Sequence, residues 1–294
     1  MDSLKNSASV EVLIIEGFLG IFHYLRGYLS AWWACRHGDY DVIHIHYGLT
    51  AAFIAWLPES IRKKIVVTLH GGDILIEQGL KTQVAITRRS IAHAGLVLGV
   101  SDEIANAARP YARHVDVLPC GVDDDFFVPA QPAPQISIIF PGDPARAVKN
   151  FPLYEAVVQA YQRLHGDVVV VVLHQLTREA VRNAMQSGAA LLMTSLSEGS
   201  PQVIKEALAC DMAVVSSDVG DVRALLADTP GTAVYGVGCS PEDIAHLLHA
   251  CIQRRPLSAG QRRARIAAAG MRNHQVVKRL DAIYARLCVQ GEGQ

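Results

Sequence analysis

The chain has 294 residues, half of them hydrophobic and 19% charged, and its formal net charge is −1. These values indicate a globular protein with room for two domains, and they exclude a disordered chain. A net charge this close to zero gives no global field for nucleic acid, so we expect no nucleic-acid partner. The six cysteines show no CxxC or Cys/His spacing, which argues against a zinc site or a disulfide framework.

The N-terminal residues are polar and contain no signal-peptide core. No charge-free apolar run reaches the roughly 20 residues that span a bilayer. We therefore expect a cytoplasmic protein.

In the first half of the chain, short apolar β-branched runs alternate with helical patterns, which is typical of βαβ units and a parallel sheet. The predicted strands are Val10–Ile15, Val42–His46, Ile65–Leu69, Leu96–Val100 and Val115–Leu118.

A helix is predicted over about residues 20–35, because apolar side chains recur there at 4-3-4 spacing on one face. Two uses fit its aromatic residues, namely cover for a sheet and contact with a membrane. These aromatic residues are Phe18, Phe22, Tyr24, Tyr28, Trp32 and Trp33.

Residues 121–135 contain three prolines, three consecutive aspartates and no helical period, so we interpret them as an interdomain linker. The alternation then restarts. The predicted strands are Ser137–Phe140, Val168–Leu173, Ala190–Thr194, Ala213–Ser216 and Thr232–Tyr235, and the predicted helices are Phe151–Leu164, Pro201–Cys210, Val222–Ala227, Pro241–Ile252 and Arg272–Cys288.

Residues 251–290 hold nine arginines or lysines against one acid, Asp281. Such a cluster fits either a solvated helix face or contact with anionic lipid headgroups.

The segment Ser195–Cys210 follows an apolar strand and opens a helix. Ser200 is expected as the N-cap and Pro201 as the first helical residue, so unpaired backbone amides can meet a phosphate or a sugar oxygen. Gly199 permits close approach to the backbone. Glu198 and Glu206 flank this helix start and can hold hydroxyl groups; the alternative is a dipole-favouring Glu198 and a surface Glu206.

A second candidate segment is FPGDPARAVKNF, residues 140–151, where a strand ends and a cationic loop opens a helix. Gly142 permits close approach to the backbone here. Lys149 and Arg146 would neutralise negative charge on a departing diphosphate. The alternative for each is a solvated surface cation.

The frame EGSPQVIKEAL around Glu198 and Glu206, followed by AVVSSDVGDV, resembles the signature of the large family four of retaining glycosyltransferases. The resemblance implies an α/β protein of GT-B type, with two Rossmann-like β/α/β domains facing a cleft. It implies that Glu198 contacts the donor sugar and Glu206 binds the ribose hydroxyls. The backbone amides of Gly199, Ser200 and Pro201 would meet the sugar and the diphosphate.

The segments YDVIHIHYGL (40–49) and VVTLHGGDI (66–74) resemble the acceptor domain of that family. A family histidine at the place of His70 touches the reacting sugar, which implies an orienting or charge-stabilising role for His70. We expect His46 and Asp73 on the acceptor side, with a structural role as the alternative. His44 and His46 share one strand face, but no third ligand is spaced for a metal, and we expect none.

Two features depart from the family pattern. The family places an arginine five or six positions before its lysine, where this chain has Asp143 or Pro144, and Arg146 is only three positions before Lys149. The first domain also lacks the opening strand, glycine-rich loop and helix of the family, so we expect it to be shortened. The predicted domains are 1–125, 126–271 and a terminal helix at 272–294, for which a return to the first domain is one option.

We therefore expect transfer of a sugar from a nucleotide-diphosphate donor to a hydroxyl acceptor, with retention implied by the resemblance alone. The donor is expected to be a UDP-sugar, with no cofactor. The acceptor is a polysaccharide or a lipid-linked saccharide, which leaves room for peripheral contact with the inner face of a membrane. The alternatives are a catalytically degenerate GT-B protein that binds nucleotide or a partner, and an epimerase or phosphorylase of the same architecture.

Overall fold

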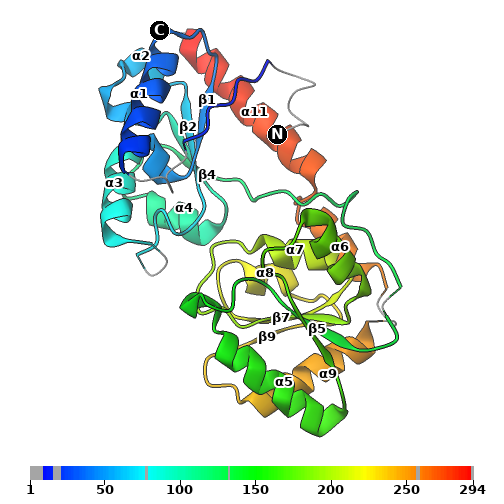
Figure 1. The fold of residues 1–294 in the computed structure, drawn as a ribbon. Helices are drawn as coiled ribbons and strands as arrows, with labels where there is room; N and C mark the ends of the chain where they lie inside the picture. The colour runs from blue at the N-terminus through cyan, green and yellow to red at the C-terminus, as the bar shows by residue number, and fades with distance from the viewer. Residues whose placement is uncertain (1–8, 16–20, 77–78, 132, 256–258, 293–294) are drawn as a thin grey trace. The chain divides into compact units, whose positions relative to one another are not determined.

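A computed structural model describes residues 9–15, 21–76, 79–131, 133–255 and 259–292 (Figure 1). The chain divides into two compact units. Unit 1 comprises residues 1–119 and 274–294, and unit 2 comprises residues 120–273. Each unit is built around its own parallel sheet, so the expectation of two Rossmann-like α/β domains is confirmed.

The sheet of unit 1 has four parallel strands in the order β1-β2-β3-β4. They are β1 (Ile43–His46), β2 (Ile65–Leu69), β3 (Leu96–Gly99) and β4 (Val115–Val117). The order follows the chain, so each crossover adds the next strand on the same side. Four predicted strands are confirmed to within two residues at each end.

The fifth prediction in this half, a strand at Val10–Ile15, is wrong. These residues form no strand, and the side chains of Val10, Val12, Leu13 and Ile14 are exposed. An apolar β-branched run becomes a strand only where a sheet edge pairs with it. In the part of the chain that the structure describes, β1 pairs only with β2.

Helices cover unit 1 on both faces of its sheet. Helix α11 (Asn273–Glu292) packs through Ile283 and Leu280 against Val66, Leu98 and Leu118. The remaining elements are α1 (Ile21–His37), the short 3-10 helices η2 (Gly48–Ala51) and η3 (Ile54–Trp56), α2 (Glu59–Arg62), α3 (Lys81–Ile91) and α4 (Asp102–Ala108). Phe18, predicted beside the first of these helices, lies outside the described residues.

The sheet of unit 2 has five parallel strands in the order β6-β5-β7-β8-β9. They are β5 (Ser137–Phe140), β6 (Val169–Val172), β7 (Ala190–Met193), β8 (Ala213–Ser217) and β9 (Thr232–Tyr235), all five as predicted to within two residues. The chain adds β6 on one side of β5 and β7 on the other. The order of winding therefore reverses between β5 and β7, and in open α/β sheets ligands bind at the carboxyl ends of the strands at this point.

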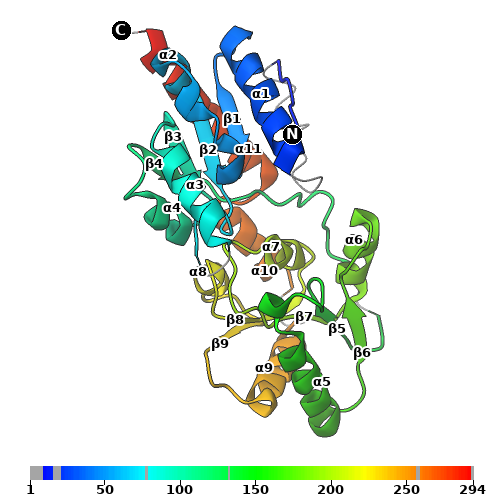
Figure 2. The same ribbon diagram turned by 60° about the vertical axis from the view of Figure 1, so that its left-hand side comes forward.

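Two helical layers enclose the sheet of unit 2 (Figure 2). Helices α5 (Phe151–His165) and α9 (Pro241–Arg254) cover one face through a core that includes Tyr154, Tyr161 and Leu248. The other face carries α6 (Arg178–Ser187), α7 (Gln202–Ala209), α8 (Val222–Leu226) and α10 (Gln261–Ala268). Parallel strands buried on both faces explain the near-continuous apolar runs in the sequence.

The segment interpreted as a linker, 121–135, packs as part of unit 2 over its described residues. Val122 and Phe127 belong to the core of that unit, and Val122 forms an isolated β-bridge with Arg272. Contacts within the chain place the boundary between the two units at Pro119 and Cys120, and they place α11 in unit 1. Apolar residues spaced among prolines and aspartates carry no helical period, so local patterning did not reveal their burial.

Candidate functional site

The segments that follow β5 and β7 form a polar site in unit 2. Gly142 and Lys149 come after β5, and Glu198 and Ser200 come after β7. Because β5 and β7 are paired neighbours with parallel direction, their carboxyl ends lie at the same edge of the sheet. The two candidate segments therefore meet at the point where the winding reverses.

Backbone hydrogen bonds fix Lys149 relative to the β7 loop. Lys149 ends the 3-10 helix η4 (Ala147–Lys149), and Asn150 follows in the left-handed conformation with φ 51°. The Thr194 hydroxyl donates to the carbonyls of Lys149 and Asn150, at 3.0 Å each. The Leu196 amide donates to the Val148 carbonyl at 2.8 Å.

Lys149 and Glu198 form the central contact of the site. The Lys149 Nζ lies 2.6 Å from Glu198 Oε1, and the two side chains are 16% and 18% exposed. A partly buried, charge-assisted pair of this length is a strong one. Gly142, at φ 131°, lies beneath it, and an added Cβ would sit 3.2 Å from Lys149 Cε. The lysine therefore lies directly against the backbone turn after β5.

Ser200 belongs to a second polar network. Its hydroxyl donates to Asp221 Oδ2 at 2.5 Å and accepts from Lys205 Nζ at 2.8 Å. Lys205 also donates to the Cys120 carbonyl at 3.2 Å, and its side chain is fully buried. Burial lowers the pKa of Lys205, whereas Asp221 raises it. A buried cation with these partners fixes the segment between β7 and α7.

The expectation that Ser200 caps α7 is wrong. The helix begins at Gln202 with Pro201 at its N-cap position, and no side chain caps it. The serine hydroxyl is engaged by Asp221 and Lys205 instead. Tertiary contacts therefore engage the Ser200 hydroxyl, which the local sequence pattern assigns to the N-terminus of the helix.

Gly199 is buried, and Gly220 packs directly against it. Gly220 has φ 56°, and a Cβ there would lie 2.4 Å from the Gly199 carbonyl oxygen and 2.7 Å from that of Glu198. Only glycine fits such a close approach in the left-handed region. The loop after β8 therefore supports the backbone that carries Glu198.

Glu206 lies one turn into α7, partly buried among apolar neighbours. Burial raises its pKa to about 7, and Arg178 and Lys205 act in the opposite direction. A hydroxyl group that donates a hydrogen bond to the Glu206 carboxylate would stabilise its charged form and lower this pKa.

The structure leaves Arg146 apart from the central pair. Its side chain is exposed at the N-cap of η4, and its backbone carbonyl accepts from the Lys149 amide at 2.9 Å. Of the predicted donor-side residues, the structure brings together Gly142, Lys149, Glu198, Gly199 and Ser200. The donor roles of all these residues, and of Glu206 and Arg146, stay predictions.

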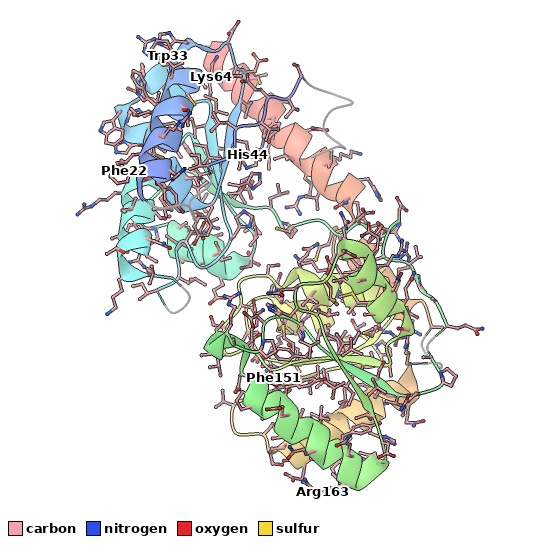
Figure 3. All side chains as sticks on the ribbon, in the orientation of Figure 1. Phe22, Trp33, His44, Lys64, Phe151 and Arg163 are labelled. Atoms are coloured by element: carbon pink, nitrogen blue, oxygen red, sulfur yellow. The ribbon has the colours of Figure 1, made fainter. Side chains whose placement is uncertain are left out.

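In unit 1, three histidines gather at the carboxyl ends of β1 and β2. The His44 and His46 rings are stacked at 4.4 Å between centroids, and His46 Nδ1 lies 3.4 Å from His70 Nε2. The Nδ1 atom of His44, the residue labelled in Figure 3, lies 2.5 Å from the Tyr284 hydroxyl on α11, and its Nε2 atom lies 2.6 Å from the Thr68 hydroxyl. Burial, then the neighbouring His46 and His70, lower the pKa of His44 to about 3.

Asp73 holds the loops that carry these histidines. Its carboxylate is fully buried and accepts from the amides of Gly48 at 2.9 Å, His70 at 3.0 Å and Gly71 at 2.9 Å. The residue therefore ties the turn after β1 to the turn after β2. This is a positioning role, and contact with an acceptor stays a prediction for Asp73, as it does for His46 and His70.

Within the described ranges, no group of three or more His, Cys, Asp or Glu is arranged to hold a metal ion. Over the same residues, no helix is both long enough and apolar enough to cross a bilayer.

Two family descriptions match the chain in succession. Residues 5–126 match Glycosyltransferase Family 4, and residues 137–254 match Glycosyl transferases group 1. The chain belongs to the GT-B glycosyltransferases of the family-four type. A Bacillus subtilis (strain 168) protein described as a candidate teichuronic acid biosynthesis glycosyltransferase, TuaC, is 27% identical over 214 residues. The match covers 63% of this chain and 55% of TuaC, so the chain spans just over half of that relative's length.

Solved structures with this fold match the chain at low sequence identity. A sucrose-phosphate synthase from Thermosynechococcus elongatus has a TM-score of 0.71 at 15% identity, covering 91% of this chain and 78% of that one. Anabaena HepE in complex with UDP-glucose has a TM-score of 0.69 at 18% identity, covering 96% and 88%. At such identities the likeness establishes the fold alone.

Sequence reasoning missed three residues that shape these sites, namely Lys205, Asp221 and Tyr284. A signal for Lys205 was present, because Pro201, Ile204, Lys205 and Leu208 follow the spacing of one buried helix face. Tyr284 lies 240 positions from His44, and nothing local connects them.

Proposed function

We propose that the protein transfers a sugar from a UDP-sugar to a hydroxyl group of a polysaccharide or lipid-linked saccharide, with retention of anomeric configuration. The observation that carries the proposal is the Lys149–Glu198 pair at the winding reversal of unit 2. Family membership supports transfer as the reaction class. The complexes of HepE with UDP-glucose and of Staphylococcus aureus TarM with UDP support a uridine nucleotide.

In this proposal Lys149 exchanges part of its contact with Glu198 for the diphosphate of the donor. A fixed cation stabilises the charge that develops on a departing diphosphate, and it needs no reorganisation during the reaction. Glu198 is then free to accept hydrogen bonds from sugar hydroxyls, while Glu206 accepts them from the ribose. Arg146, on its exposed turn, adds positive charge for the phosphates.

On the acceptor side, His70 orients the reacting sugar, and His46 and Asp73 support the acceptor. No metal ion or other cofactor takes part, so activity is expected to persist in excess EDTA. A lipid-linked acceptor resides in a bilayer, and the proposal therefore includes peripheral contact with the inner face of a membrane. The relative's assignment to teichuronic acid biosynthesis supports a cell-surface polymer as the product class.

The test is calorimetric titration of the purified chain with UDP, GDP and ADP, together with the variant Glu206→Ala. We expect one nucleotide to bind, and the substitution to weaken its binding at least tenfold, or about 1.4 kcal/mol. Glu155→Ala is the matched control, because Glu155 is an exposed glutamate on α5 of the same unit. No nucleotide binding by a folded sample would contradict the donor site.

Turnover is tested separately, with the preferred nucleotide as a sugar conjugate and saccharide acceptors. Nuclear magnetic resonance of the product reports its anomeric configuration. Nucleotide binding without any transfer would favour a catalytically degenerate protein. A changed sugar still attached to its nucleotide would identify an epimerase.

A further inference from the structure

Helix α1 in unit 1 exposes an apolar stripe along most of its length. Phe22 is 82% exposed, Leu25 52%, Leu29 70% and Trp33 61%. At about 100° per residue these four side chains fall within an arc of roughly 80°. Scattered exposed apolar residues need no explanation, but a continuous stripe of this kind marks an interaction surface.

The opposite face of α1 packs against the protein. Ala31 and Cys35 are buried, the Tyr28 hydroxyl donates to the Leu49 carbonyl at 2.9 Å, and Trp32 Nε1 donates to the Trp56 carbonyl at 3.3 Å. The 4-3-4 spacing that predicts this helix places Leu25 on one face with Ile21, Tyr28 and Trp32, and Leu25 is 52% exposed at the boundary of that face with the apolar stripe. Trp56, 71% exposed on η3, lies next to the helix and extends the apolar surface.

The charges on this face are of one sign. Helix α1 contains no aspartate or glutamate. Arg26 and Arg36 are exposed, and both fall within an arc of roughly 100° that contains the apolar stripe. Long arginine side chains beside aromatic and aliphatic ones suit an interface where lipid tails meet anionic headgroups.

The basic cluster of residues 251–290 is less suited to contact with lipid headgroups than its sequence suggested. Arg262 is fully buried, and Arg255 is 9% exposed. Arg263 and Arg272 both contact Asp124, at 3.4 Å and 3.1 Å. These four cations stabilise unit 2 and are not presented to a membrane, whereas Arg254, Lys278, Arg279 and Arg286 of the cluster are exposed.

We propose that α1 docks on a bilayer that contains anionic phospholipid, with Phe22, Leu25, Leu29 and Trp33 inserted among the lipids and Arg26 and Arg36 at the headgroups. Figure 3 labels Phe22 and Trp33 near the two ends of this helix, so the stripe spans nearly all of it. The inference rests on the proposed function only for the lipid-linked acceptor. The exposed stripe of α1 is present whether or not sugar is transferred.

The experiment is co-sedimentation of the full chain with vesicles of phosphatidylcholine alone, which carry no net charge, and with vesicles that contain about 30% phosphatidylglycerol, which gives an anionic surface. We expect binding to the anionic vesicles, with a blue shift of tryptophan emission. Leu29→Ser combined with Trp33→Ser is expected to reduce partitioning at least tenfold. Arg26→Gln combined with Arg36→Gln is expected to remove the preference for anionic vesicles.

The matched control is Leu164→Ser, which removes a single exposed leucine from α5 in unit 2, where it lies outside the stripe and is 45% exposed. Nucleotide titration of each variant shows whether unit 2 is intact, so loss of membrane binding is distinguishable from failure of the donor site. Equal partitioning of the Leu29/Trp33 variant and the parent overturns the proposal. The proposal is also overturned if the parent protein does not bind vesicles. It is overturned too if the parent forms a dimer that the Leu29/Trp33 variant abolishes, because a second copy of the chain would then cover the stripe.

Discussion

The two units use the same kind of sheet for different tasks. In unit 2 the winding reverses between β5 and β7, and polar groups converge at that edge as the Lys149–Glu198 pair. In unit 1 the described strands wind in one direction only, and the groups at their carboxyl ends are imidazoles held by buried Asp73. The comparison teaches that the strand order brings the polar segments of unit 2 to one edge of its sheet, whereas unit 1 depends on specific hydrogen bonds to form its polar surface.

The charge state of the two sites differs in the same sense. Unit 2 places the Lys149 cation where we propose that the donor phosphates bind. In unit 1, burial lowers the pKa of His44, His46 and His70 and so favours their neutral form. Repulsion from neighbouring histidines adds to this for His44 and His46, whereas Asp73 acts in the opposite direction on His70. We therefore expect nucleotide binding to depend on unit 2 alone. A substitution in unit 1 that abolishes nucleotide binding would contradict this difference between the two units.

The largest effect is expected for Lys149→Met. Removing the cation that would face the departing diphosphate should lower kcat by about 10²–10³-fold, in line with the loss of a preorganised charge-stabilising group. UDP affinity should fall as well. His70→Ala in unit 1 should leave UDP affinity unchanged within about twofold, since UDP lacks the transferred sugar that His70 is proposed to orient. Steady-state kinetics and calorimetry measure both. A His70→Ala variant that no longer binds UDP would end the assignment of nucleotide binding to unit 2.

A smaller but still large effect is expected for the folding of unit 1. Asp73→Ala leaves three backbone amides without their buried acceptor and should lower the free energy of unfolding by about 3 kcal/mol. Urea titration followed by tryptophan fluorescence measures this, because Trp32, Trp33 and Trp56 all lie in unit 1.

The control for Asp73 is Asp116→Ala in the same unit. Asp116 is 51% exposed at the side chain and lies 3.6 Å from Arg286, and an exposed pair contributes at most about 1 kcal/mol. Equal destabilisation by the two substitutions would show that the buried carboxylate does not organise the loops.

The smallest effect is a pH dependence of opposite sign in the two units. The pKa of Glu206 is raised to about 7 in the folded state, so unit 2 binds the proton first and gains stability as pH falls from 7 toward 4.5. The pKa of His44 is lowered to about 3, so the unfolded chain binds the proton first and unit 1 loses stability below pH 6.5. Each slope is at most about 1.4 kcal/mol per pH unit.

Hydrogen exchange of β2 and β7 amides between pH 7 and 5, corrected for intrinsic rates, reports the two units separately. Glu206→Gln should remove the gain in unit 2 and leave unit 1 unchanged. His44→Gln should reduce the loss in unit 1, to which His46 and His70 also contribute, and leave unit 2 unchanged. Parallel trends in both units would mean that these two side chains do not set the pH response.

Much of the fold was predictable because its information is local. Nine of ten predicted strands are present, since β-branched runs separated by helical patterns specify buried parallel strands. The strand at Val10–Ile15 failed because pairing requires a sheet edge, which no local pattern supplies. Helix α6, between β6 and β7, was not predicted, although its amphipathic pattern begins at a threonine N-cap.

The site divides in the same way. By itself the sequence determined the order of strands and helices, and it identified Lys149, Glu198 and Glu206 as candidates, because strand ends, glycines and helix starts are coded by neighbouring residues. Tertiary structure decided that Lys205 is buried against Ser200, and that Tyr284 meets His44 across 240 positions. It also decided that α1 keeps an apolar face exposed while Arg262 is buried. These outcomes depend on which surfaces come into contact, and burial and partnership of a side chain are properties of the packed chain.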